Sequence, residues 1–171
     1  MPDHDAHFVG KVTQKAVLFG PTDELVLVKA ESRWTFPGGT FEYGETLVGS
    51  LIRELEEELG LQATIGPPVE AIYGGWFDDE TGDPMVAIIY RAETHSRAVD
   101  LGDEHRDYTW VSPDDACLLL RPPRYRTAVR RALELGTDEP FAPVVDPYHE
   151  YETGTDEILS QLRDRRLADR S

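Results

Sequence analysis

The strongest helical pattern in the chain lies at 46–60, where aliphatic and acidic side chains recur and the run ends at a glycine. At about 100° per residue, four aliphatic side chains fall within about 60° of one another: Val48, Ile52, Leu55 and Leu59. Gly60 stands where a left-handed cap commonly ends a helix. The pattern therefore predicts a helix over 46–59 that packs through one face, which requires an apolar surface elsewhere in the chain.

The same helix carries three carboxylates at positions i, i+3 and i+4, namely Glu54, Glu57 and Glu58. Like charges at this spacing repel one another and weaken a helix unless a cation lies among them. Oxygen ligands of this kind suit Mg²⁺ or Mn²⁺, so the spacing predicts a divalent metal site, with a solvated acidic face as the alternative. Arg53 lies four residues before Glu57 and eight after Glu45, and its planar fork can hold a carboxylate in a fixed orientation.

The composition limits the classes of partner. The 171 residues include 17 Lys and Arg against 33 Asp and Glu, a formal charge of −16, which argues against duplex DNA or RNA as a partner. No apolar run reaches the roughly 18 residues of a membrane span, and we see no secretory signal, so we expect a cytoplasmic protein without a membrane partner. Only three basic residues are lysines, which with the acidic excess suggests a halophilic source; an ordinary acidic protein is the alternative.

Turn residues divide the chain into short elements. We expect strands over 15–19, 24–29, 34–36, 69–77, 85–94 and 106–111, with the third stopping at Pro37-Gly38-Gly39. We expect further helices after Ser112, which is placed as an N-cap, and over 124–135. The length and these patterns predict a loose terminus at 1–10, one domain at 11–135, and a C-terminal arm with a helix at 136–171.

Nine positions of the segment 39–61 match the pattern Gly-x5-Glu-x7-Arg-Glu-U-x-Glu-Glu-x-Gly-U, in which U is aliphatic. They are Gly39, Glu45, Arg53, Glu54, Leu55, Glu57, Glu58, Gly60 and Leu61. Such a match arises by chance on the order of once in 10⁹ start positions at average residue frequencies. The pattern is the Nudix box, and the chain resembles the Nudix hydrolases over roughly 11–135. The resemblance implies the α/β class and a Nudix-type α/β/α sandwich with a mixed β-sheet.

The resemblance also implies an activity, the hydrolysis of a nucleoside diphosphate linked to another moiety. Water attacks the diphosphate bridge, and Mg²⁺ or Mn²⁺ is the cofactor that neutralises the phosphate oxygens. By position, the resemblance implies metal ligands and a supporting pair: Glu54, Glu57, Glu58 and the Gly39 carbonyl, with Glu45 and Arg53 supporting the helix. Glu57 is also a candidate to activate the water.

A later loop offers further candidates. The family pattern makes Glu104 an additional metal ligand and His105 a candidate base, against the alternatives of an exposed loop acid and a surface histidine. The acidic run Asp78, Asp79 and Glu80 competes with Glu104, with a solvated turn as its alternative.

A nucleobase requires a stacking surface, and three aromatic residues at the end of the strand 69–77 are candidates to bind substrate: Tyr73, Trp76 and Phe77. Core packing is the alternative role for them. The substrate is a small-molecule nucleotide, and both a nucleoside triphosphate and a nucleotide sugar stay open. A non-catalytic domain that senses nucleotides or supports assembly is the alternative function. A homodimer is expected partly from the family and partly from the arm at 136–171.

Overall fold

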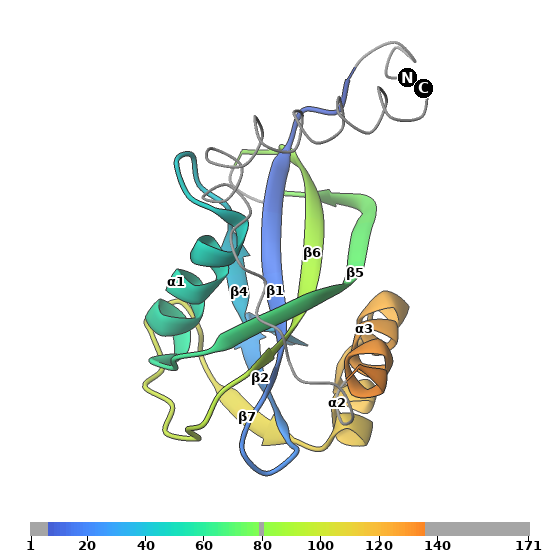
Figure 1. Cartoon of the computed structure of the whole chain (residues 1–171). Coiled ribbons are helices and arrows are strands. Elements are labelled where there is room, and N and C mark those ends of the chain that lie inside the picture. Colours follow the sequence, from blue (N-terminus) through green and yellow to red (C-terminus); the bar gives the residue numbers. More distant parts are fainter. Residues whose placement is uncertain (1–6, 79–80, 136–171) are drawn as a thin grey trace, which may run out of the picture.

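The computed structural model describes residues 7–78 and 81–135, with the side chains of 74–77 also outside the description. These residues form one seven-stranded mixed sheet and three helices. Helix α1 (Leu47–Leu59) covers one face of the sheet, and α2 (Pro113–Leu119) and α3 (Pro123–Glu134) lie on the other (Figure 1). The expected α/β/α sandwich with a mixed sheet is confirmed.

The strands are β1 Lys11–Phe19, β2 Leu25–Ala30, β3 Arg33–Thr35, β4 Gly38–Thr40, β5 Thr64–Phe77, β6 Pro84–Glu93 and β7 Tyr108–Val111. Hairpins join β1 to β2, β2 to β3 and β5 to β6, and longer connections lead from β4 through α1 to β5 and from β6 to β7. Strands β1 and β6 are parallel over their whole length, and the other pairs are antiparallel. The main path runs β3-β2-β1-β6-β5, with β4 on β1 and β7 on β2. Strand β1 is therefore central, and its first half lies beside β4.

The core has two layers because the apolar strands are covered on both faces. Alternate residues of β1 divide between the layers: Ala16 and Leu18 pack with the α1 side, whereas Val17 and Phe19 pack with the α2 and α3 side. Strand β1 thus holds both helical layers to the sheet. Within the described residues, no helix is both long and apolar enough to cross a bilayer.

The packing face of α1 differs from the expected one. Ile52 is 38% exposed, whereas Leu51, which the aliphatic pattern left out, is fully buried. Glu58, which is not among the aliphatic residues expected to pack, is only 5% exposed. The cause is a polar contact with the sheet, since the Glu58 carboxylate accepts the Gly38 N–H at 2.9 Å.

The strand ends differ in part from the expected ones. Strand β3 stops before Pro37, as expected, but pairing resumes at Gly38, which takes φ +139 and begins β4 beside β1. Strand β1 begins at Lys11 rather than at 15. Strand β5 begins at Thr64 rather than at 69 and passes through Pro67 and Pro68. Its pairing with β6 shifts register on both sides of Pro68, and irregular pairing of this kind tolerates a residue without an N–H.

Candidate active site

Helix α1 is fixed at both ends by its own sequence. The Thr46 hydroxyl accepts the Gly49 N–H at 3.0 Å, and Gly60 adopts φ 63 as its N–H donates to the Glu56 carbonyl at 2.9 Å. These caps set the length of the helix between β4 and β5. Because the helix lies beside β4, the carboxylates of its second half lie near the glycines of that strand.

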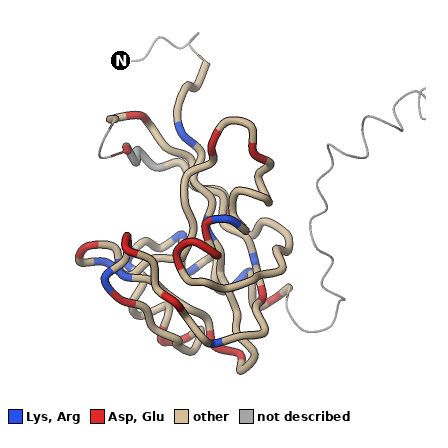
Figure 2. Tube along the Cα trace, turned by 90° about the vertical axis from the view of Figure 1, so that its left-hand side faces the viewer, with Lys and Arg blue, Asp and Glu red and all other residues tan. Residues whose placement is uncertain are grey.

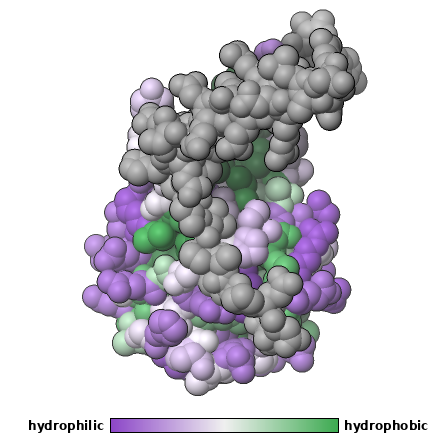
Figure 3. Space-filling model, in the orientation of Figure 1, coloured by the Kyte–Doolittle hydropathy of each residue, from purple (hydrophilic) through white to green (hydrophobic). Residues whose placement is uncertain are grey.

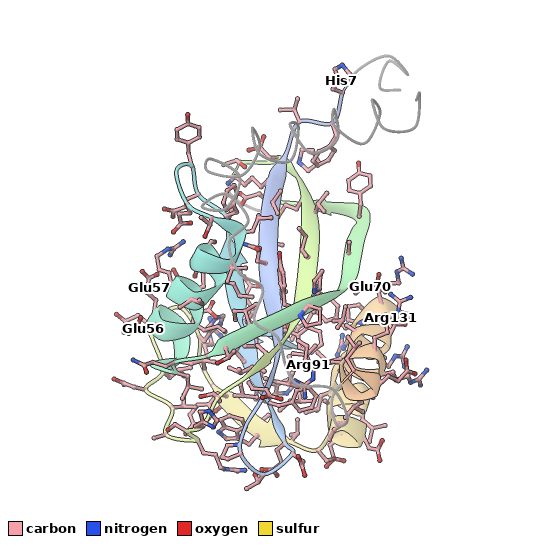
Figure 4. The ribbon with its side chains drawn as sticks, viewed as in Figure 1. His7, Glu56, Glu57, Glu70, Arg91 and Arg131 are labelled. Carbon is pink, nitrogen blue, oxygen red and sulfur yellow. The ribbon has the colours of Figure 1, made fainter. Side chains whose placement is uncertain are left out.

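A single guanidinium joins three of the carboxylates. Arg53 binds Glu45 through two parallel contacts, Nε to Oε1 at 2.5 Å and Nη2 to Oε2 at 3.1 Å. Its Nη1 lies 3.1 Å from Oε1 of Glu54 and 3.0 Å from Oε2 of Glu57. The bonded guanidinium lowers the pKa of the Glu45 carboxyl, and Glu45 in turn raises the pKa of Arg53. Figure 4 labels Glu57 and its neighbour Glu56 on this helix.

Glu58 connects α1 to two other parts of the chain. Its Oε2 accepts the Gly38 N–H at 2.9 Å, and its Oε1 lies 2.7 Å from Nε2 of His105. The hydrogen bond with Glu58 raises the pKa of the His105 imidazole. This buried carboxylate therefore ties the helix to β4 and to the loop that precedes β7.

Gly38 and Gly39 of β4 both have close neighbours that leave no room for a side chain. A Cβ at Gly39 would lie 2.2 Å from the carboxylate carbon of Glu54, so only a glycine lets that carboxylate lie against the strand. A Cβ at Gly38 would lie 2.0 Å from the Gln14 carbonyl oxygen of β1. Burial raises the pKa of the Glu54 carboxyl, and the nearby Glu58 and Glu57 carboxylates add to the rise.

The donor set fits a hard divalent cation. The side chains of Glu54, Glu57 and Glu58 and the Gly39 carbonyl supply oxygen atoms, and the crowding of the carboxylates is the kind that a cation relieves. Within the described residues, no three His, Cys, Asp or Glu side chains are already grouped as metal ligands. Arg53 holds Glu54 and Glu57, and His105 holds Glu58. Glu54 and Glu57 each give Arg53 only one oxygen atom, so the second oxygen of each carboxylate can bind a cation while Arg53 keeps its contacts.

The other acidic candidates lie differently. Glu104 is exposed, and its charge adds to the raised pKa of His105 without a hydrogen bond to the box carboxylates. Asp78 pairs with Lys11 on β1 at 3.0 Å. Asp79 and Glu80 lie outside the described residues. The structure brings His105, but not Glu104, into contact with the helix carboxylates.

The aromatic candidates belong to β5. Tyr73 is 64% exposed and packs edge-on against Phe8, with ring centroids 5.4 Å apart. Trp76 and Phe77 pair through their backbones with Met85 and Pro84, and their side chains lie outside the description. The stacking role of these residues stays a prediction.

Sequence reasoning missed two residues of β1. The Thr13 hydroxyl donates to the Gly39 carbonyl at 3.2 Å, and Lys15 Nζ donates to the Phe36 carbonyl at 3.3 Å. Burial lowers the pKa of the Lys15 amine, and the carboxylates of Glu58 and Glu54 act in the opposite direction. The signal in the sequence was the polar run Thr-Gln-Lys within an otherwise apolar strand, since a strand buried on both faces normally excludes such residues.

The protein is an α/β sandwich in which the carboxylates of α1 lie against the glycines of β4. The family model of the NUDIX domain matches residues 11–134. The chain therefore belongs to the Nudix family.

Relatives and solved structures agree with this fold. The chain is 29% identical over 90 residues to the nucleoside triphosphatase NudI of Escherichia coli strain SE11, a match that spans 48% of this chain and 64% of that protein. The Caenorhabditis elegans Ap4A hydrolase binary complex has a TM-score of 0.63 at 21% identity, covering 73% of this chain and 96% of that one. The solution structure of the E. coli ORF135 protein has a TM-score of 0.59 at 24% identity, covering 75% of this chain and 91% of that one.

Proposed function

We propose that the protein hydrolyses a nucleoside diphosphate linked to another moiety, either a nucleoside triphosphate or a nucleotide sugar. The observation that carries this proposal is the arrangement of the α1 carboxylates, with Glu54 against Gly39, Glu58 bonded to the Gly38 N–H, and Arg53 fixing Glu54 and Glu57. Family membership and the relatives named as a nucleoside triphosphatase and as an Ap4A hydrolase support the same class of reaction. The nucleoside triphosphate has the more direct support, since the former relative is named for it.

The proposed roles of the site residues are to hold the metal ion and to orient its ligands. Glu54, Glu57, Glu58 and the Gly39 carbonyl hold Mg²⁺ or Mn²⁺, with Glu104 as a further ligand. The bound cation neutralises the charge on the diphosphate oxygens. Arg53 and Glu45 keep the helix carboxylates in orientation, as groups behind a ligand commonly do.

The reaction transfers a phosphorus group to water. The water oxygen bonds to phosphorus, the bridging P–O bond breaks, and the leaving phosphate keeps the bridging oxygen with its electron pair. Glu57 takes the proton of the attacking water; His105 is the alternative base. Replacing His105 with Gln separates the two, since a kcat near that of the parent protein excludes His105 as the base.

The test is product release from a panel of nucleoside triphosphates and nucleotide sugars with Mg²⁺ or Mn²⁺. Glu57→Gln and Glu58→Gln keep the shape of the side chain but remove its charge, and each is expected to lower kcat by at least about 100-fold. The matched control is Glu56→Gln, one residue before Glu57 on the same helix, exposed and unspecified in the box pattern. It is expected to retain the parent rate.

The alternative is a domain that binds nucleotides without turnover. Equilibrium binding of a panel nucleotide by the unmutated protein, with no product under either metal, would favour that alternative. Equal loss in the Glu56 variant and the Glu57 variant would instead indicate a general effect of helix charge and would contradict the proposed ligand roles.

A further inference from the structure

The chain contains three lysines, all on β1 and β2, and they differ in their partners. Lys11 forms an ion pair with Asp78 at 3.0 Å, and Lys29 lies over the Trp34 ring, with Nζ 5.6 Å from the centroid. Lys15 Nζ donates one hydrogen bond, to the Phe36 carbonyl, and forms no ion pair with the described residues. An ammonium carries three donors, so two of its N–H groups are available to a ligand.

The position of Lys15 follows from the register of β1 and β4. Lys15 lies opposite Gly38, the residue whose N–H binds Glu58, and Gly39 beside it accepts the Thr13 hydroxyl. Because glycines leave no side chains on this part of β4, the amine lies close enough to Glu58 and Glu54 to interact electrostatically with both. Its charge also acts on His105. Lys15 is thus partly exposed at the place where the box carboxylates and the sheet meet.

A phosphate chain suits this place chemically. A ligand held among the carboxylates by a divalent cation brings several anionic oxygens, and a partly buried ammonium with unused donors pairs with such an oxygen more strongly than an exposed one. The amine repels a cationic ligand, and with a neutral acceptor it forms a weaker hydrogen bond than with an anionic oxygen. We infer that Lys15 is a substrate-binding residue that contacts a phosphate oxygen of the nucleotide, on the β1 side of the box carboxylates.

This inference rests on the proposed function, and its kinetic test uses the best substrate of the panel. Lys15→Met removes the charge and keeps the length of the side chain; it is expected to raise KM about 10-fold or more with a smaller change in kcat, and Lys15→Arg is expected to restore part of the affinity. Lys11→Met, on the same strand with its own carboxylate partner, is the matched control and is expected to keep the parent KM. An unchanged KM in a folded Lys15→Met protein overturns the inference.

A second measurement uses the unmutated chain and no turnover. Incorporation of ¹³C-labelled lysine gives each lysine Cε an NMR signal without changing its N–H groups, and three lysines make the spectrum simple to assign from the variants. Titration with inorganic pyrophosphate and Mg²⁺ is expected to shift the Lys15 signal and leave the Lys29 signal in place. If turnover is absent but Lys15 shifts, the proposed function fails and the phosphate site stands; if turnover is present but Lys15 does not shift, the inference fails alone.

Discussion

Gly38 and Gly39 are adjacent, yet their substitution should have different effects. A Cβ at Gly39 would meet the flexible end of Glu54, whereas a Cβ at Gly38 would meet the backbone of β1 at a positive φ. Gly39→Ala is therefore expected to lower kcat/KM about 10-fold or more, with less than about 1 kcal/mol lost in the free energy of unfolding. Gly38→Ala is expected to lose about 2–4 kcal/mol.

Denaturant unfolding and steady-state kinetics on both variants check this pair of expectations. Gly44, which also has a positive φ but has no atom within 4 Å of an added Cβ, is a suitable control for backbone strain alone. Equal loss of stability at Gly38 and Gly39 would show that the Glu54 carboxylate does not yield to the added methyl group.

The contacts of Arg53 depend on the planar shape of its guanidinium. Its two parallel contacts to Glu45 and its contacts to Glu54 and Glu57 need the fork of a guanidinium, which an ammonium cannot reproduce. Arg53→Lys keeps the charge and is expected to lower kcat about 10–100-fold, the usual cost of disturbing groups that orient metal ligands. Steady-state kinetics measure this loss, and thermal unfolding checks that the variant is folded. A kcat within twofold of the parent would contradict the orienting role of Arg53.

For single residues, the sequence predicted the contacts between residues that are close along the chain. The spacing of four and eight residues placed Arg53 within reach of Glu57 and Glu45, and both contacts occur. Lys15 could not be placed in the same way, because its proximity to Glu58 depends on the pairing of β1 with β4 and on α1 crossing that pair. Such contacts join residues about 40 positions apart, and no local pattern encodes them.

Among the elements, α3 is attached to the sheet by a buried carboxylate. Glu70 of β5 is 7% exposed, and Arg131 of α3 lies 3.1 Å from it and also donates to the Val69 carbonyl at 3.2 Å (Figure 4). Arg131→Ala is expected to lose about 1–2 kcal/mol in the free energy of unfolding. This is less than the 3–5 kcal/mol typical of a fully buried pair, because half of the Arg131 side chain is exposed.

Arg124 is the control for that experiment. It comes from the same helix and approaches Glu70 only to 3.7 Å, with 60% of its side chain exposed, so Arg124→Ala is expected to change stability by less than about 0.5 kcal/mol. Both variants introduce Ala into the same helix, which equalises helix propensity. Chemical denaturation gives both values, and equal losses would remove the special role of Arg131.

Helices were easier to predict than strands for a physical reason. The caps at Gly60 and Ser112 are local devices, and the structure has both. Thr46, predicted as the first helical residue, is the N-cap of α1. Strand β4 was missed because Pro-Gly-Gly is a turn signal, and only the neighbouring strand β1 makes its extended pairing favourable. The start of β5 was missed because Pro67 and Pro68 normally stop a strand, while irregular pairing with β6 accommodates them.

For the whole molecule, the state of association stays a prediction, since the arm at 136–171 lies outside the described residues. We expect a homodimer that depends on this arm. Light scattering of the full chain and of a chain ending at residue 135 checks this expectation. A dimer of the full chain that becomes a monomer on truncation supports it, and a monomer in both samples contradicts it; a dimer in both would place the interface within 1–135.

The net charge of the molecule predicts that its thermal stability depends on salt. Acidic residues recur along the described chain and basic ones are fewer (Figure 2), and hydrophilic side chains dominate much of the face seen in Figure 3. With a formal charge of −16, the folded state carries self-repulsion that salt screens. Raising NaCl from about 0.01 M to 0.5 M, over which the Debye length falls from about 30 Å to roughly 4 Å, is expected to raise Tm by several degrees.

The shape of that dependence separates screening from other effects of salt. Screening is nearly complete by about 0.5 M because the Debye length is then close to the size of an ion pair, so Tm should level off above it. A Tm that continues to rise to molar salt would indicate exclusion of salt from the protein surface, which strengthens apolar burial. A Tm that does not change between about 0.01 M and 0.5 M would show that the 33 acidic side chains are far enough apart, or well enough paired, for their repulsion to have little effect on folding.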